Sequence, residues 1–340
     1  MGLVGVAPRN IAKAKIPVAS TSFVLGLEMD FLAQQYALQG AYSAAFPTGW
    51  SFTRATAGNA QNADGSWVAF TSGQPRITTR GLCIEEARTN LFLNSSAPVT
   101  QAVTLATGTY QVTVWGSTGS VTTSAGTATA TGYGAISAST FGTSQAIVVT
   151  VGGTITVTVA GSPLYVQVEL GTMPSTHILT AGASATRNMD AVLVTGISSV
   201  LSQPYVLYAD ADLPLGDGLA RTFLTSSAGS DASRLYVGRS AGNVAILGVT
   251  GGVGDNNVSV SGFSGAQASM RTAGRIRSTG LCMSANGTLS SDAPQTPPTG
   301  HDRVNLGTNA AGTSNMKGYL RRIGVRPISL TDAELIGITA

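Results

Sequence analysis

Apolar and polar residues alternate in short runs through most of the chain, and this alternation predicts β-strands. The most regular runs lie in residues 97–188, where glycine-rich turns separate them. In the first of these runs Tyr110, Val112 and Val114 share one face. The strands expected here are 109–115, 147–151, 154–159 and 164–170. Their spacing and turns are typical of an antiparallel β-sandwich.

A second β-rich unit follows in residues 189–340. Its expected strands are 205–213, 234–238, 243–247, 281–284, 304–307 and 318–325. One helix start stands out near the end, where Thr331 and Glu334 fit a capping box. Leu335 and Ile338 would share one face of that helix. The predicted fold class is therefore all-β.

The first 96 residues divide into two parts. Residues 1–25 are polar and punctuated by proline, which predicts an extended arm, either a frayed terminus or a tether that orders against a partner. Residues 26–96 are rich in aromatic side chains, with strands expected at 49–54 and 67–70. We therefore divide the chain into 1–25, 26–96, 97–188 and 189–340.

Charge is almost absent from the middle of the chain. Between Arg88 and Arg187 the only Asp, Glu, Lys or Arg is Glu169. A sandwich with so few charges is prone to pairing at its edges when it is free in solution. We expect neighbouring copies or another protein to cover it.

Composition excludes several classes of protein. The 340 residues are 43% hydrophobic with a net charge of +3, which argues against wholesale disorder. The small, scattered basic excess predicts no nucleic-acid partner. No apolar run is long enough to span a membrane, and no secretory signal is recognisable. We therefore expect synthesis in a cytoplasm, or exit by a route that does not use such a signal. Cys83 and Cys282 are expected to be buried free thiols rather than a disulfide.

Catalytic and metal-binding patterns are weak. Asp210 and Asp212 would share a strand face, as a hydrolytic carboxylate pair requires. We prefer to interpret them as solvated acids at a strand end, with a catalytic or metal-binding role as the alternative. His177 and His301 have no nucleophile motif around them. The segment 251–255 lacks the lysine of a phosphate loop, and Asp255, Asn256 and Asn257 suit a surface turn better than a calcium site. We expect no catalytic residues, no cofactor and no metal.

Glycan binding would combine an aromatic platform with planar polar side chains. Two groups have this composition: Arg234, Tyr236, Arg239 and Asn243 form one, and Asn305, Asn315 and Tyr319 form the other. The competing interpretation is that both tyrosines belong to the core. A basic run, Arg271, Arg275 and Arg277, could meet an acidic polysaccharide or stay solvated.

Several segments resemble the appendage proteins of tailed bacteriophages. Residues 51–56, 64–65, 75–76 and 81–91 resemble their entry module, with Cys83 where Leu or Val is usual. Residues 167–171 and 186–190 look like the sandwich that follows it. Residues 318–327 and 330–335 resemble the closing strand and helix of a concanavalin-like jelly roll.

The resemblance implies an antiparallel β-sandwich followed by a concanavalin-like jelly roll. It also implies a virion structural protein, a tail or head fibre or spike component that attaches to other virion proteins, forms an oligomer (a homotrimer being favoured) and meets host surface polysaccharide. The alternatives are a polysaccharide-degrading tailspike, a capsid decoration protein without a receptor role, and a cellular lectin or adhesin.

Five residues are expected at the attachment end or at interfaces: Trp50, Trp67, Glu85, Glu86 and Arg88. Glu85 and Glu86 are adjacent, so they would point to opposite faces of a strand and cannot form a catalytic pair. A salt bridge between domains or subunits is the preferred role, with an exposed acidic patch as the alternative.

Overall fold

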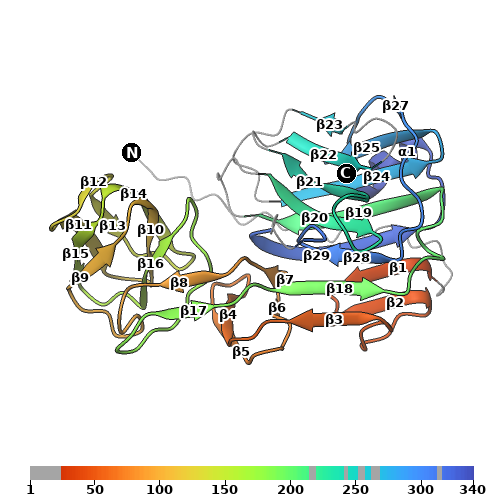
Figure 1. Cartoon of the computed structure of the whole chain (residues 1–340). Helices are drawn as coiled ribbons and strands as arrows, with labels where there is room; N and C mark the ends of the chain where they lie inside the picture. Colours follow the sequence, from red (N-terminus) through yellow and green to blue (C-terminus); the bar gives the residue numbers. More distant parts are fainter. Residues whose placement is uncertain (1–23, 214–219, 241–243, 252–256, 262–268, 312–315) are drawn as a thin grey trace, which may run out of the picture.

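The chain folds into two β-sandwiches of unequal size that lie end to end (Figure 1). The computed structural model describes residues 24–213, 220–240, 244–251, 257–261, 269–311 and 316–340. Most of the expected arm, residues 1–23, lies outside these described residues. All sheet pairings in the structure are antiparallel, and among the described residues there is one α-helix. The all-β fold class is confirmed.

The larger sandwich is the jelly roll, built from two sheets. The first contains, in order, β2 (Gln35–Gly40), β1 (Val24–Asp30), β29 (Gly318–Arg326), β19 (Tyr205–Asp212), β24 (Ser269–Arg277), β25 (Gly280–Ala285) and β26 (Thr288–Leu289), with β6 (Ile77–Thr78), β7 (Gly81–Ile84) and β27 (Ala293–Pro294) beside it. The second contains β23 (Val258–Val260), β22 (Val244–Thr250), β21 (Arg234–Ser240), β20 (Arg221–Ser227), β28 (Arg303–Leu306), β18 (Ala191–Thr195) and β3 (Trp50–Thr53).

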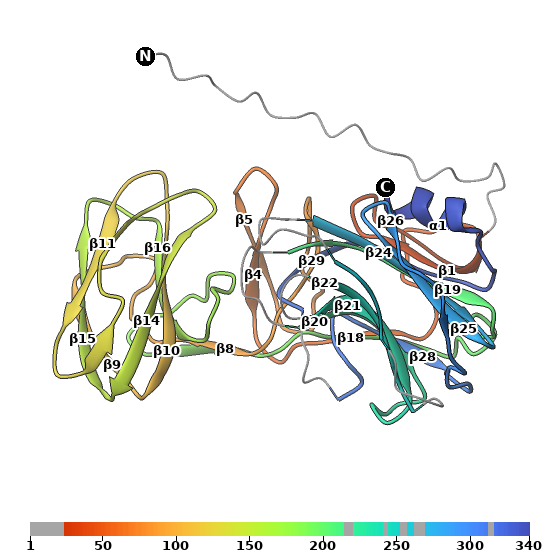
Figure 2. The ribbon, with the colours of Figure 1, turned by 90° about the horizontal axis from the view of Figure 1, so that it is seen from above.

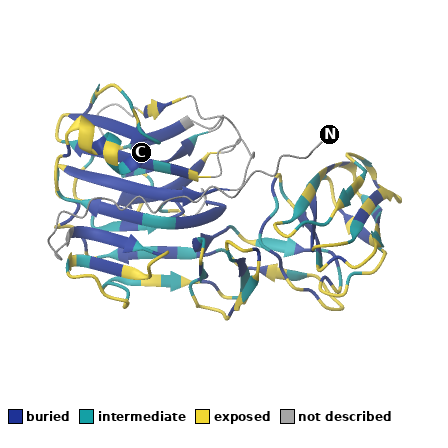
Figure 3. Ribbon diagram, turned by 180° about the vertical axis from the view of Figure 1, so that it is seen from behind, coloured by how far each residue is buried: buried dark blue, intermediate teal, exposed yellow. Residues whose placement is uncertain are grey.

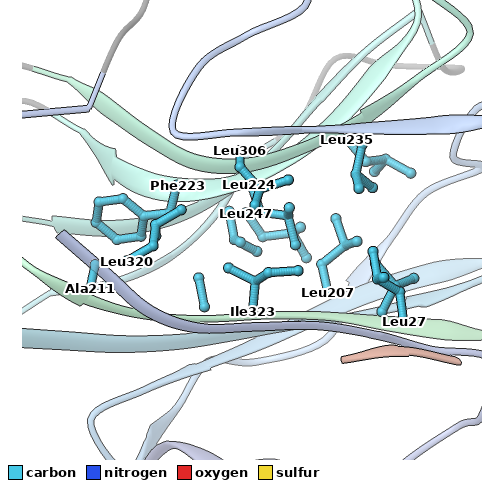
Figure 4. Close-up of a cluster of buried hydrophobic side chains, with 14 of the residues drawn as sticks. Leu27, Leu207, Ala211, Phe223, Leu224, Leu235, Leu247, Leu306, Leu320 and Ile323 are labelled. Atoms are coloured by element: carbon cyan, nitrogen blue, oxygen red, sulfur yellow. The ribbon is translucent and has the colours of Figure 1, made fainter. Parts of the chain in front are cut away.

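The core of the larger sandwich lies between these two sheets. Leu27, Leu207 and Ile323 project from the first sheet, and Leu224 and Leu306 project from the second toward them (Figure 4). Each is fully buried, because alternate positions of every strand face inward.

The smaller sandwich is the charge-poor segment. One sheet has the order β12 (Thr129–Thr131), β14 (Thr143–Val151), β10 (Gly108–Trp115) and β16 (Tyr165–Leu170). The other has the order β13 (Ala135–Ser137), β11 (Ser120–Ala125), β15 (Gly153–Ala160) and β9 (Gln101–Leu105). Its separate core includes Val112, Ile147, Val157 and Val168, as the alternation predicts. Figure 3 shows that many exposed residues lie in this smaller unit.

Strands from the segment 26–96 belong to the sheets of the jelly roll. β1 pairs with β29, β3 pairs with β18, and β7 pairs with β29. The smaller sandwich is therefore an insertion between β7 and β18, and not a unit that simply precedes the jelly roll. Sequence order alone does not reveal this, because the closing strands are more than 200 residues away from β1.

Short elements connect and complete the two units. The strands β8 (Arg88–Asn90) and β17 (Ala185–Arg187) pair in the passage between the sandwiches, next to the hairpin of β4 (Gly58–Gln61) and β5 (Trp67–Phe70) (Figures 1 and 2). The helix α1 (Asp332–Thr339) begins with the expected capping box and buries Leu335 against the jelly roll. Cys83 and Cys282 are free and buried. Among the described residues, no helix is long and apolar enough to span a membrane.

Candidate functional site

The outer face of the second jelly-roll sheet carries an aromatic and polar surface. Leu235 and Val237 of β21 lie in the core, so Arg234 and Tyr236 alternate with them and face outward. The Arg234 guanidinium carbon lies 5.2 Å from the centre of the Tyr236 ring. Burial raises the pKa of the Tyr236 phenol, so its hydroxyl stays protonated and can donate a hydrogen bond at neutral pH.

Asn305 of β28 joins the same face from two strands away. Thr225 of β20 lies opposite Tyr236 on one side and opposite Asn305 on the other. Two strand spacings therefore separate Tyr236 from Asn305, about 10 Å between their backbones. The Asn305 side-chain oxygen is buried and has no hydrogen-bond partner among the described residues.

A loop closes one side of this surface through Asp231. The Asp231 carboxylate accepts a hydrogen bond from the Asn309 side-chain amide at 2.8 Å and one from the Ala310 backbone N–H at 2.9 Å. It also pairs with Arg234 at 2.7 Å. Asp231 thus fixes both the loop after β28 and the position of Arg234. We call Asp231, Arg234, Tyr236, Asn305 and Asn309 the β21–β28 surface.

The other residues expected to bind glycan lie elsewhere. Tyr319 is 4% exposed, its hydroxyl accepts a hydrogen bond from the Gln61 backbone N–H, and Arg80 covers its ring at 4.2 Å. It belongs to β29 in the opposite sheet from Asn305, so the pairing of Tyr319 with Asn305 is wrong. Arg239 is buried and, two residues after Val237 in β21, lies on the same inward face of the sheet. Asn243 and Asn315 lie outside the described residues.

Asp231 and Asn309 were missed by sequence reasoning. The three-residue spacing from Asp231 to Arg234 was a weak signal for an ion pair. Nothing in the sequence relates Asn309 to Asp231, because the topology alone brings the loop after β28 to the start of β21.

A buried ion network occupies the junction between the two sandwiches. Asp190 pairs with Arg54 at 3.0 Å and also with Arg76. Glu85 pairs with Arg76 at 2.9 Å and with Arg187 at 3.0 Å. All these side chains are at most 6% exposed. We call these five residues the junction network.

The junction network explains the role of Glu85. Burial by itself would raise the pKa of Glu85, but Arg187 and Arg76, with hydrogen bonds from Thr176, lower it to about 2. The carboxylate thus stays ionised and joins the end of β7 to segments next to the smaller sandwich. This is the salt bridge between domains that we preferred from the sequence.

Glu86 and Arg88 form a second, more exposed group at the junction. Glu86 pairs with Arg88 and, at 2.6 Å, with Lys317, which are not partners of Glu85. Both glutamates lie between β7 and β8 and not in the strand that the sequence had led us to expect. Arg88 also lies 4.0 Å from Glu169, the one charged residue of the central segment. Glu169 is fully buried.

The two tryptophans expected at the attachment end lie in different places. Trp67 meets Trp115 edge-on at 5.8 Å and His177 at 6.2 Å, so it packs the β4–β5 hairpin against the smaller sandwich. Trp50 stacks on Phe46 at 4.4 Å and packs against the jelly-roll core. Both contacts are within the chain.

The weak catalytic candidates are held in structural contacts. Asp210 lies 3.5 Å from Arg271 and 3.7 Å from Arg321, and Asp212 pairs with Arg80 at 3.0 Å. Arg275 and Arg277 of the basic run both pair with Asp292.

Both histidines are buried as neutral side chains. Burial lowers the pKa of His177 to about 3 and the pKa of His301 to about 4. His177 stacks on Tyr165 at 3.8 Å, and His301 lies between Ser226 and Ser233. Among the described residues, no cluster of three His, Cys, Asp or Glu side chains could hold a metal ion. Asp255 and Asn256 lie outside them.

Comparisons with known proteins give distant likenesses. No family model matches the chain, and no curated protein matches it. The CBM40 of the Ruminococcus gnavus IT-sialidase, bound to α2,6-sialyllactose, aligns with a TM-score of 0.36 and 16% identity over 42% of this chain and 86% of that chain. The LG4-5 domains of the mouse laminin α1 chain align with a TM-score of 0.31 and 11% identity over 72% of this chain and 88% of theirs.

A third solved structure, the binding domain of botulinum neurotoxin DC in complex with SialylT, gives a TM-score of 0.34 and 11% identity over 44% of this chain and 38% of that chain. Assignment of the fold rests on the sheets and cores described above.

Proposed function

We propose that this chain is a non-catalytic component of a tailed-phage particle, a fibre or spike subunit whose jelly roll binds host surface polysaccharide. The observation that carries the binding role is the β21–β28 surface. A half-buried tyrosine, a guanidinium fixed by a carboxylate and an unpartnered carboxamide oxygen lie on one sheet face.

These groups suit a hydroxyl-rich ligand. A sugar offers apolar C–H faces to an aromatic ring and hydroxyl groups to planar donors and acceptors. The Asn305 oxygen can accept a hydrogen bond from a ligand hydroxyl, and the loop held by Asp231 keeps Arg234 in place.

The junction network supports the phage assignment. Arg54, Arg76, Glu85, Arg187 and Asp190 all fall in segments that carry the resemblance to appendage proteins, and all five meet in one place. The segments that resemble appendage proteins therefore contain the buried ion pairs that hold the two sandwiches together. This is the arrangement expected of a rigid appendage.

Binding to a panel of bacterial surface polysaccharides tests the proposal. We expect the full chain to bind at least one polysaccharide, and Tyr236→Ala and Asn305→Ala each to weaken that binding about tenfold, which corresponds to about 1.4 kcal/mol. Tyr42→Ala is the matched control, because Tyr42 is an exposed tyrosine on a different part of the jelly roll. Equal binding by all three variants would place the contact elsewhere.

Two further readouts separate the alternatives. Release of reducing ends that Asp210→Asn abolishes would indicate a polysaccharide-degrading tailspike. Electron microscopy of particles labelled with an antibody against residues 189–340 distinguishes tail from head. Label on the capsid together with no polysaccharide binding would indicate a decoration protein.

A further inference from the structure

In the part of the chain that the structure describes, the smaller sandwich ends in an edge strand that is paired on one side alone. β9 is the last strand in the order β13-β11-β15-β9. Figures 1 and 2 show this sheet on the side of the smaller sandwich that is remote from the jelly roll. An approaching molecule can therefore reach β9 without meeting the larger unit.

The backbone of β9 directs hydrogen-bonding groups outward at two residues. The Thr154 N–H donates to the Thr127 hydroxyl at 2.9 Å, and the Thr154 carbonyl accepts from the Ala128 N–H at 3.0 Å. The N–H and carbonyl of Thr154 thus point away from β9. Thr104 lies opposite Thr154, so the N–H and carbonyl of Thr104 must point away from β15, toward the outside of the sheet. Ala102, two residues earlier, shares that direction.

These outward groups have no protein partner. No backbone hydrogen bond among the described residues reaches the N–H or carbonyl of Ala102 or Thr104. The edge strand also lacks the usual protection against pairing, because it has no charge, no proline and no bulge in its register with β15. Two other edge strands have backbone partners on their outer side: β2 bonds to Ser43, and β16 bonds to Leu91.

The surface around β9 is uncharged. The outward positions of this sheet are Ala102, Thr104, Ser120, Thr122, Ser124, Ala135, Ser137, Thr154, Thr156, Thr158 and Ala160. A charged partner would lose hydration against such a face without gaining an ion pair. A second copy of this chain brings an equally uncharged face and the same small side chains.

We propose that two copies of this chain pair through β9, antiparallel and about a two-fold axis at Val103. In this register Ala102 lies opposite Thr104 of the second copy, so the outward groups of both residues form four backbone hydrogen bonds across the axis. Val103 and Leu105, which face the core, meet core-facing positions of the other copy, and the two sheets join into one of eight strands.

The contact is small, and its size sets its strength. Five residues on each side bury much less than the roughly 800 Å² per partner of a standard interface. Isolated copies should therefore pair weakly, and copies that are already held close together should pair strongly. The inference goes beyond the proposed function and does not depend on glycan binding.

Sedimentation velocity of the full chain over a wide concentration range tests this pairing. We expect a monomer–dimer equilibrium, weakened at least tenfold by Ala102→Pro or Thr104→Pro. Each proline removes one outward N–H and leaves the bonds between β9 and β15 intact. Thr104→Lys serves as a second variant, because it places two like charges on one joined sheet face, and circular dichroism checks that every variant folds.

Thr122→Lys is the matched control, because it adds a charge at the centre of the same outer face but away from the edge. We expect it to leave the equilibrium unchanged. Loss of association in Thr122→Lys with retention in the proline variants would mean that the faces stack, and would overturn the edge pairing. A wild-type chain that stays monomeric at millimolar concentration, or a trimer indifferent to all these variants, would overturn it as well.

Discussion

Glu85 illustrates how single residues stabilise the junction. Its carboxylate is surrounded by Arg76, Arg187 and the backbone and hydroxyl of Thr176, with almost no contact with solvent. A buried charge is tolerated only when such partners compensate for its lost hydration. Each member of the junction network therefore depends on the others, and the loss of one leaves an uncompensated charge inside the protein.

Acid should destabilise the protein in two pH ranges. The folded-state pKa of Glu85, about 2, lies below its unfolded value of 4.5, so its contribution is complete above about pH 4.5 and disappears as the pH falls toward 2. This shift corresponds to about 3 kcal/mol. Burial lowers the pKa of His177 from 6.5 to about 3 in the folded protein. As the pH falls, His177 is therefore protonated in the unfolded chain before it is protonated in the folded one, and stability begins to fall below pH 6.5.

Urea unfolding at pH 7, 5.5, 4 and 3 measures both losses. Glu85→Gln should reduce the loss below pH 4.5 and leave the loss between pH 6.5 and 5 unchanged. The same pH profile in the variant and the wild type would mean that Glu85 is not ionised and paired in the folded protein.

At the scale of the element, β22 sets the position of the tyrosine on β21. Gly248 lies opposite Tyr236, and a Cβ added at Gly248 would overlap the Tyr236 ring. The ring therefore packs over the glycine, and the Arg234 guanidinium carbon lies 5.2 Å from the ring centre. A residue that touches no ligand thus decides the geometry of the β21–β28 surface.

Gly248→Ala should displace the Tyr236 ring and reduce polysaccharide binding as strongly as Tyr236→Ala. The added methyl group should also cost about 1–3 kcal/mol of unfolding free energy, as overpacking does. Gly182→Ala is the control for both measurements, because no atom lies within 4 Å of its added Cβ. Unchanged binding by Gly248→Ala would show that the ring position does not matter for the ligand.

At the scale of the whole molecule, the two sandwiches have separate cores but share a charged and aromatic junction. Residues from the end of β7, from the β4–β5 hairpin and from the segment around β17 meet there. The sheets of the jelly roll are complete only when β18 and the strands after it pair with β1, β3 and β7. The two segments that lead into and out of the inserted smaller sandwich must therefore lie close together. The junction network does so where the two passages run side by side.

Calorimetry should therefore record one cooperative unfolding transition for the wild type. Glu85→Ala removes the link to Arg187 and should lower the transition temperature by roughly 6–12 °C, because breaking a buried pair costs about 3–5 kcal/mol. The smaller sandwich should then unfold as a separate step. Asp292→Asn, which alters an exposed ion pair, is the control and should shift the transition very little. Two transitions in the wild type would show that the sandwiches are not coupled.

The sequence by itself determined the local elements of this protein. The four strands expected in residues 97–188, their core positions and the helix cap at Thr331 all follow from short-range periodicity and backbone preference. Arg234 and Tyr236 could be placed on one face for the same reason, since residues two apart in a strand share a side.

Only the tertiary structure decided which distant residues meet. Asn305 joins Tyr236, and Tyr319 does not, because the two sheets divide β28 from β29 and the loop after β28 returns to Asp231. The membership of β1, β3 and β7 in the jelly roll has the same origin. Strand order is set by the free energy of burying two sheet faces against each other. Because that free energy is a property of the whole sandwich, it leaves no periodic signal in the sequence of any one segment.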